Sequence, residues 1–204
     1  METQKMATVC VGIGNKKIGA QVPTFSLPSK ITCPGKSDWC ETHCYADRFE
    51  RMRPNIRTAY ERNLAICRYP VLLVNFILKK LTVSFPWFRI HPSGDFFSVG
   101  YINAWQEIVA ARPNIQFWSY TRSWAVDELR KPLEQLKALP NMHLYASTDP
   151  DMPLPPENWP VAFIESDPRA TGTPCQYRFG NAASCLECEY CLQNDNRNVI
   201  FKQH

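Results

Sequence analysis

A strand-then-helix pattern recurs in the middle of the chain, and this repeat constrains the fold more than any other feature. The stretch from Phe88, "FRIHPSGDF", begins with alternating apolar residues, and residues 98–114 then place apolar side chains at helical spacing. Further strands are predicted from Ile115 and Met142, 27 residues apart, each after a "PN" pair that ends a helix. Repeated units of this kind, joined by right-handed crossovers, predict a parallel α/β sheet.

The remaining segments extend this sheet without completing a full barrel. Residues 161–167 predict another strand, and residues 54–81 predict one or two helices, broken near Pro70. Roughly four units in 204 residues predict a partial (β/α) barrel of parallel strands rather than eight units. We expect this barrel in residues 1–169 and a small cysteine-rich, cluster-binding appendage in residues 170–204.

Polar residues follow each predicted strand. Parallel α/β folds bind ligands at the carboxyl ends of their strands, so these side chains are expected to face one mouth. They are His91, Ser93, Gly94 and Asp95; Tyr120, Thr121 and Arg122; Ser147, Thr148 and Asp149; and Glu165, Ser166 and Asp167.

The chain contains nine cysteines, and seven of them lie in two local groups. In a reducing compartment such a count points to metal ligation or catalysis before disulfides. The C-terminal group places Cys185, Cys188 and Cys191 at C-x2-C-x2-C spacing, with Cys175 upstream. This compact run with one more distant thiol is typical of a [4Fe-4S] cluster held by four protein ligands.

The N-terminal group, Cys33, Cys40 and Cys44, has three thiols and no evident fourth. Closed structural sites use four protein ligands, whereas a catalytic site keeps one position for a small molecule. We therefore expect a second [4Fe-4S] cluster with one open iron. The alternative is a closed site completed by a nearby side chain; the candidates are His43, Asp38 and Cys10.

Zinc is the rival metal, and buried thiols without any metal are the remaining alternative. Structural zinc sites usually present two C-x2-C pairs on separate knuckles, and three thiols within seven residues depart from that arrangement. Whichever metal binds, the folding of residues 170–204 is expected to depend on it, because few apolar residues there could form a core.

With these motifs the chain resembles the radical S-adenosylmethionine (SAM) superfamily. The resemblance rests on the three-cysteine loop ahead of a partial barrel and on "HPSGDF", which stands where that superfamily carries a Gly-Gly-Glu type segment. It implies that SAM binds the open iron, with Ser93, Gly94 and Asp95 near its ammonium group. It also implies reductive cleavage of SAM, with a flavodoxin or ferredoxin as reductant. The cysteine spacing, C-x6-C-x3-C, is longer than the superfamily's usual C-x3-C-x2-C.

The segments "TFSLPSKITCPG", "CPG...WC..HCYA" and "HPSGDFF" also resemble a phage-encoded family called gene product eighty-eight. This resemblance covers most of the chain and implies a phage protein. The last four cysteines, with Cys175, Gly180 and Cys185 at Cys-x4-Gly-x4-Cys spacing, resemble the auxiliary clusters of some radical SAM enzymes. That resemblance implies that the second cluster has a structural or an electron-transfer role.

Residues at the later strand ends are predicted to meet the substrate. Arg122 could bind a carboxylate or phosphate through paired donors while Tyr120 stacks on a base, and a surface ion pair is the alternative for Arg122. Glu165 could contact ribose hydroxyls or form a turn. Asp95 has a second interpretation as the N-cap of the helix that follows it.

Composition limits the partners. The net charge of +4 favours anionic ligands without the dense basic stripe of a dedicated nucleic-acid binder. The N-terminus lacks the apolar region of a signal peptide, and the longest apolar run, residues 71–78, is far shorter than the roughly 18 to 20 residues that span a bilayer. We expect a cytoplasmic protein without a membrane segment.

These observations predict an iron-sulfur protein with two [4Fe-4S] clusters. Radical SAM-like enzymology on a small-molecule or nucleotide-like substrate is the activity that the resemblance implies. Two other functions stay open. One is a non-enzymatic two-cluster electron carrier or redox sensor, and the other is a zinc-stabilised nucleic-acid-binding module.

Overall fold

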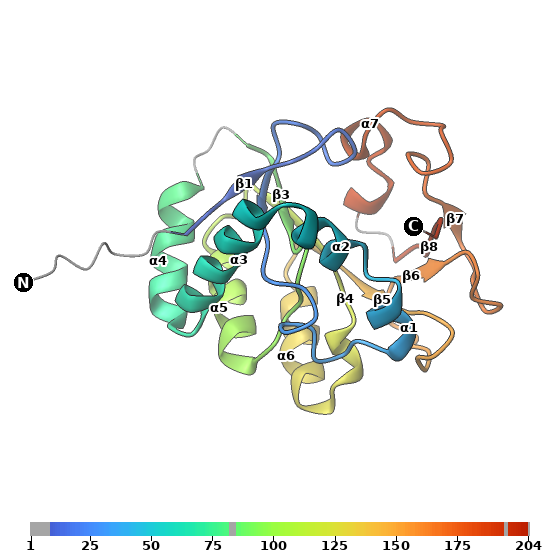
Figure 1. The fold of residues 1–204 in the computed structure, drawn as a ribbon, viewed down its shortest axis with the longest axis horizontal. Coiled ribbons are helices and arrows are strands. Elements are labelled where there is room, and N and C mark those ends of the chain that lie inside the picture. Colours follow the sequence, from blue (N-terminus) through green and yellow to red (C-terminus); the bar gives the residue numbers. More distant parts are fainter. Residues whose placement is uncertain (1–8, 82–84, 194–195, 204) are drawn as a thin grey trace, which may run out of the picture.

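The computed structural model describes residues 9–81, 85–193 and 196–203, and its strands form one sheet. The strands are β1 (Gly12–Ile13), β2 (Pro23–Phe25), β3 (Trp87–Ile90), β4 (Gln116–Thr121), β5 (Met142–Ser147), β6 (Val161–Ile164), β7 (Thr173–Pro174) and β8 (Val199–Phe201). Their order across the sheet is β1-β2-β3-β4-β5-β6-β8-β7 (Figure 1). Every neighbouring pair is parallel except β1 and β2.

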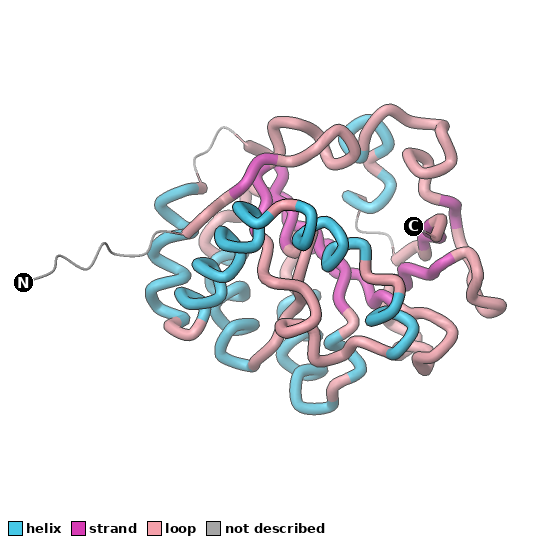
Figure 2. Tube along the Cα trace, viewed as in Figure 1, coloured by secondary structure: helices cyan, strands magenta, loops and turns pink. Residues whose placement is uncertain are grey.

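The helices confirm the predicted strand-helix units. They are α1 (Asp38–Thr42), α2 (Tyr45–Met52), α3 (Pro54–Cys67), α4 (Pro70–Lys80), α5 (Val99–Ala110), α6 (Asp127–Lys137) and α7 (Cys185–Cys188), with the 3-10 helices η1 (Ser123–Ala125) and η2 (Tyr190–Leu192). Helix α5 connects β3 to β4, and η1 with α6 connects β4 to β5 (Figure 2). The break near Pro70 is confirmed, since proline suits the first turn of α4 while the residue before it avoids the helical conformation.

The two faces of the sheet bury different side chains. Phe88 and Phe117 belong to the main core, together with Trp105 of α5, on the face that the helices cover. Trp118 and Tyr145 belong to two smaller clusters that also include residues of the C-terminal segment. This division follows from the alternation of side chains along a strand. The second face is therefore where β3 to β5 meet the C-terminal segment.

The predicted fold class is confirmed at the level of a mixed α/β fold with a mostly parallel sheet. The strand order ends in β1 and β7, and no ladder among the described strands joins these two. The C-terminal segment extends the same sheet, because β8 pairs in parallel with β6 and places Ile200 opposite Phe163. Strand β7 then pairs with β8 at the edge.

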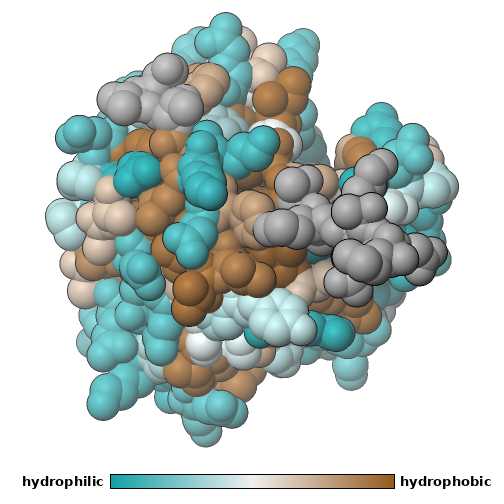
Figure 3. All heavy atoms as spheres, turned by 90° about the vertical axis from the view of Figure 1, so that its left-hand side faces the viewer, coloured by the Kyte–Doolittle hydropathy of each residue, from teal (hydrophilic) through white to brown (hydrophobic). Residues whose placement is uncertain are grey.

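No helix within the described ranges is long and apolar enough to cross a membrane. Residues 1–8, part of the stretch in which no signal peptide was expected, lie outside the described residues. Figure 3 views the molecule from the side that carries α4, where apolar side chains gather at the surface. Val71 and Leu72 of α4 are exposed, as is its N-cap Tyr69.

Candidate metal-binding and ligand cavity

All seven cysteines of the two predicted groups line one cavity of about 550 Å³. They are Cys33, Cys40, Cys44, Cys175, Cys185, Cys188 and Cys191. The other two cysteines are not among the lining residues: Cys10 lies just before β1, and Cys67 is buried at the end of α3. All nine are free thiols. The fold thus brings together residues 33–44 and 175–191, which are far apart in the chain.

The N-terminal cysteines lie on a loop and two short helices whose caps are local. The Ser37 hydroxyl caps α1 by accepting a hydrogen bond from the backbone N–H of Cys40 at 3.0 Å. Cys44 is the N-cap of α2, and its sulfur accepts from the N–H of Asp47 at 3.5 Å. Both helices are short, and in each the side chain of the N-cap residue accepts a hydrogen bond from a backbone N–H of the first turn. Each cap places a cysteine at the first turn of a helix.

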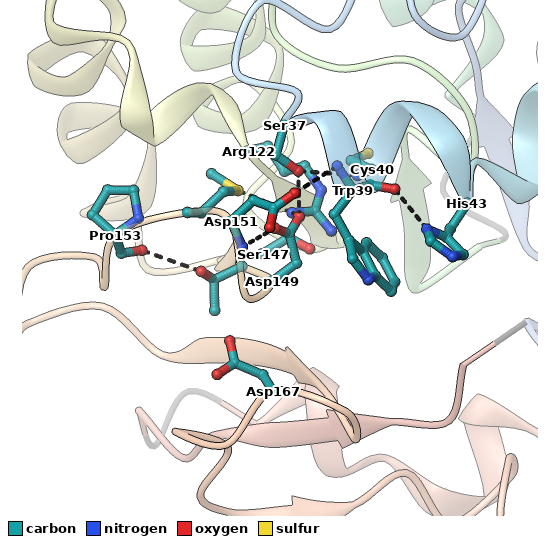
Figure 4. A network of polar contacts seen from close by, with 12 residues as sticks. Ser37, Trp39, Cys40, His43, Arg122, Ser147, Asp149, Asp151, Pro153 and Asp167 are labelled. Carbon is teal, nitrogen blue, oxygen red and sulfur yellow. Dashed lines mark hydrogen bonds and ion pairs between the residues drawn. The ribbon is translucent and has the colours of Figure 1, made fainter.

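Long-range contacts attach this loop to the end of β5 (Figure 4). The Ser37 hydroxyl donates to Asp149 Oδ2 at 2.7 Å, and the N–H of Trp39 donates to Asp151 Oδ2 at 2.9 Å. Asp149 is fully buried, and it also pairs with the Arg122 guanidinium. Because the buried carboxylate is bound from two sides, it connects the cysteine loop to β4 and β5.

The structure corrects the predicted role of Arg122. Its guanidinium forms an ion pair with Asp149 and contacts the sulfur of Met152 at 3.0 Å, and its side chain is only 15% exposed. The alternative of an ion pair is therefore right, although the pair is buried rather than on the surface. Arg122 lines the cavity but its charge is already matched by a carboxylate.

Asp95 is buried and also bound within the chain. Its carboxylate accepts hydrogen bonds from the Thr121 hydroxyl at 2.6 Å, from the N–H of Arg122 at 2.8 Å and from its neighbour Phe96 at 2.7 Å. The expectation that Asp95 is the N-cap of the next helix is wrong, because Ser98 caps α5. Asp95 lines the cavity, yet its oxygens hold the end of β3 against the end of β4.

Ser93 and Gly94 also line the cavity, and both pack closely against neighbouring segments. The Ser93 hydroxyl donates to Glu50 Oε1 of α2 at 2.6 Å. Gly94 has a φ of +80°, and a Cβ there would lie 2.6 Å from Leu27 Cβ. Glycine is required at this position, because an added carbon would force the loop away from β2.

Tyr120 and Glu165, the other two predicted ligand-site residues, lie in different places. Tyr120 lines the cavity, and its ring lies 5.3 Å from that of Tyr145. Glu165 is exposed and is not among the lining residues; its carboxylate accepts from the N–H of Gln203 at 3.0 Å. The prediction that Glu165 faces the ligand is wrong, because the residue falls just past β6 and turns toward the C-terminus.

The C-terminal cysteines are held by backbone contacts to two other segments. The N–H of Cys175 donates to the carbonyl of Ile200 at 2.8 Å, and the N–H of Cys185 donates to the carbonyl of Lys17 at 2.6 Å. Ser184 caps the short helix α7, whose C-cap Glu189 has a φ of +51°. The compact C-x2-C-x2-C run is therefore wound as one helical turn followed by a left-handed residue and a 3-10 turn.

Burial raises the pKa of four of these thiols, those of Cys33, Cys40, Cys185 and Cys191. It raises the pKa of Cys33 far above the ordinary thiol value, and the nearby Asp95 adds to that effect. Burial also raises the pKa of Cys191 to about 12, against a hydrogen bond from Tyr120. As bare thiols, Cys33 and Cys191 keep their protons at neutral pH, so metal binding must release a proton from each of these two if they become ligands.

No group of three or more His, Cys, Asp or Glu side chains in the described ranges is arranged to hold a single metal ion. A single zinc ion gathers its thiolates to about 2.3 Å, so ligands of one ion must lie close to one another. In a [4Fe-4S] cluster each thiolate binds a different iron and the ligands surround a larger core. The thiols of the described residues that line the cavity therefore form no ready-made site for a single ion.

The three candidates for a fourth ligand of the N-terminal group are placed differently. His43 lines the cavity; its Nδ1 is 2.9 Å from the carbonyl of Trp39, and its ring stacks on the Trp39 ring at 4.4 Å. Asp38 is exposed, and neither it nor Cys10 lines the cavity. His43 is therefore the remaining candidate of the three, through its Nε2 atom.

Four basic residues of the cavity were not predicted as site residues: Lys16, Lys17, Arg89 and Arg178. Arg89 of β3 is 7% exposed, with its guanidinium 4.4 Å from the centre of the Tyr120 ring. Lys17 contacts the ring of Phe201 at 4.9 Å, and burial lowers its pKa. The sequence gives one hint, the arginine within the apolar strand "WFRI". A charged residue is uncommon in a buried strand and usually has a specific partner or role there.

The chain is thus a largely parallel α/β protein with a cysteine-lined cavity beside its sheet. The chain belongs to the family described as Gene product 88, whose model matches residues 2–200. The resemblance to that phage family is thereby confirmed.

Two phage relatives match along most of their length. The chain is 28% identical over 219 residues to the Gene 88 protein of Mycobacterium phage L5 and 32% identical over 220 residues to the Gene 88 protein of Mycobacterium phage D29. Each match covers 92% of this chain and 89% of the relative. No solved structure matches the chain.

Proposed function

We propose that this protein is an iron-sulfur protein with two [4Fe-4S] clusters in one cavity, and that its activity is radical SAM-like. The N-terminal cluster is held by Cys33, Cys40 and Cys44, with one iron open to SAM, and the second by the four C-terminal cysteines. The main support for the proposal is that the seven grouped cysteines line the cavity and the two isolated ones do not.

The rest of the cavity fits such a group. Basic side chains, Arg89 and Lys17 among them, lie near the C-terminal thiols and would balance the charge of thiolates. Aromatic rings of Trp39 and Tyr45 flank the N-terminal cysteines and line the same wall, where they would limit access of water. We also propose that the parallel strands and their helices form a partial (β/α) barrel.

Cys33, Cys40 and Cys44 would hold the open cluster, which would supply the electron for reductive cleavage of SAM when it is bound. The chain's own residues position the reactants. Asp95 holds the ends of β3 and β4 together, and Gly94 allows the loop after β3 to pack closely against Leu27. The electron must come from a reductant such as a flavodoxin or ferredoxin.

A non-enzymatic electron carrier is the second candidate, because His43 lines the cavity beside Cys44. If His43 Nε2 binds the fourth iron, both clusters are closed by protein and no position is left for SAM. Two closed clusters that share one cavity would then exchange electrons with each other and with a partner.

Anaerobic purification followed by iron and sulfide quantification tests the clusters. Two cubanes predict about eight irons per chain. Cys40→Ser and Cys188→Ser are each expected to lose about half of the iron, whereas Cys10→Ser, the same change outside the cavity, keeps it. A colourless protein with zinc and no iron would contradict the proposal and favour the zinc-stabilised nucleic-acid-binding module.

Electron paramagnetic resonance of the reduced protein, with and without SAM, separates the two iron-sulfur functions. A SAM-dependent change of the spectrum and 5'-deoxyadenosine formation under dithionite are expected for the enzyme. If neither occurs in the reduced eight-iron protein, the carrier is the correct function. In that case His43→Ala is expected to change the spectrum of the N-terminal cluster.

A further inference from the structure

Arg89 is a buried cation whose hydrogen-bonding capacity is only partly used. Its Nη2 donates to the carbonyl of His91 at 3.3 Å, while its Nη1 is buried and has no partner among the described residues. The guanidinium lies over Tyr120 at 4.4 Å and near Trp118 at 5.9 Å, and the residue lines the cavity. Two aromatic rings therefore lie beside a donor that has no acceptor in the described part of the chain.

The cavity as a whole is more basic than the chain. Its lining includes five basic residues and one acidic residue, against 23 and 19 in the whole sequence. The single acid, Asp95, already accepts three hydrogen bonds. Arg122 is paired with Asp149, but no ion pair in the described ranges includes Arg89 or Lys17.

A buried cation is unfavourable unless an anion lies beside it, because burial of an uncompensated charge costs several kcal/mol. Arg89 is 7% exposed, and the half-buried Lys17 lines the same cavity. Arginine offers donors that suit carboxylate and phosphate, and the Nη1 of Arg89 has no partner among the described residues.

We propose that Arg89, assisted by Lys17, binds the oxyanion, a carboxylate or a phosphate, of a small molecule that occupies the cavity between the two cysteine groups. This inference deepens the proposed function by naming the class of substrate that the cavity accepts. It differs from the prediction for Arg122, whose charge is taken by Asp149. The competing role for Arg89 is to balance the charge of the thiolates, since it lies near Cys185.

The test uses the full chain, purified anaerobically with its metals, and titration calorimetry with two matched pairs of probes. AMP and adenosine differ by a phosphate, and benzoate and benzamide differ by a carboxylate charge. At least one anion is expected to bind about tenfold or more tightly than its neutral partner. The pair that shows the preference identifies the anion as phosphate or carboxylate.

The variants assign that preference to Arg89. Arg89→Gln is expected to abolish it, and Arg89→Lys to keep part of it. Arg57→Gln removes the same charge from an exposed position on α3 outside the cavity and is expected to change nothing. If Arg89→Gln does not fold, Lys17→Gln serves as the test, with an expected loss of about threefold or more.

Three results would overturn the inference: equal binding within each pair, no detectable binding of either anion at millimolar concentration, or a preference that survives in Arg89→Gln. Loss of iron from Arg89→Gln with an unchanged preference would assign the residue to the thiolates. The outcome is independent of the clusters. An Arg89-dependent preference in a protein without iron supports the anion site and removes the iron-sulfur function, and the converse result removes the anion site alone.

Discussion

His91, just after β3, shows how a cavity residue is fixed by its surroundings. Its backbone is left-handed, with a φ of +56°, and its ring is 3% exposed. The ring Nε2 shares a hydrogen bond of 2.7 Å with the Tyr101 hydroxyl. Burial, together with the nearby Arg89, lowers the pKa of His91 well below its ordinary value. The folded protein therefore keeps this histidine neutral.

This histidine predicts a pH dependence of stability. Below about pH 6.5 the unfolded chain protonates His91 while the folded protein does not, so the free energy of unfolding falls as the pH falls. The contribution is about 1.4 kcal/mol per pH unit below that point. Urea unfolding of the wild type and of His91→Asn, whose new side chain tolerates a positive φ, measures it. The variant should lose this part of the slope, and parallel profiles would contradict the prediction.

At the scale of elements, the cysteine loop depends on a close backbone contact with the end of β4. A Cβ at Gly35 would lie 2.0 Å from the carbonyl oxygen of Arg122. Gly35→Ala must therefore displace the loop, and we expect it to lower the free energy of unfolding by more than about 2 kcal/mol and to reduce iron uptake. Gly100→Ala in α5 meets only Pro70 Cγ at 3.6 Å and is the control, expected to be neutral or stabilising.

The helix caps give a second prediction at this scale. Ser37 and Ser98 both cap helices, but only Ser37 also donates to a buried carboxylate, Asp149. Ser98→Ala is expected to cost about 1 kcal/mol for the lost cap. Ser37→Ala should cost about 1–3 kcal/mol more, because it leaves Asp149 with one hydrogen bond fewer. Denaturant unfolding of both variants measures the difference, and equal losses would show that the Ser37–Asp149 bond contributes nothing.

At the scale of the whole molecule, stability is unevenly distributed. The main core packs α4, α5 and α6 against β3 to β5. Among the described residues from 170 onward, the buried apolar side chains are only Cys175, Leu192 and Val199. Such a segment has too small a core of its own and depends on the pairing of β8 with β6. A metal held as in the proposed function would add to this support.

Removal of the metal should therefore loosen one part of the molecule. Under anaerobic chelation of the iron, amide hydrogen exchange is expected to accelerate at least about tenfold in residues 175–192 and 33–44. The strands β3 to β5 should keep their protection, because one of their faces packs in the main core, which contains none of the seven cavity cysteines. Hydrogen exchange with mass spectrometry makes this comparison. Uniform acceleration, or none, would show that metal and fold are not coupled in this way.

Local patterns in the sequence were sufficient to predict much of the fold. The alternation and helical spacing between residues 88 and 147 predicted β3, α5, β4, α6 and β5, and Pro70 predicted the break between α3 and α4. The cysteine spacing defined both groups before any contact was known. These features depend on residues a few positions apart, where side-chain periodicity and backbone limits act directly.

Contacts between distant parts of the chain assigned the roles that spacing could not. Ser37 and Asp149 are 112 residues apart, and their hydrogen bond is part of the network that matches the charge of Arg122. Arg89 forms no ion pair with any described residue, and its Nη1 has no partner among them. The same folding placed both cysteine groups around one cavity and turned Glu165 away from it. A charge finds its partner through proximity in space, and periodicity along a strand or helix carries no information about which partner that will be.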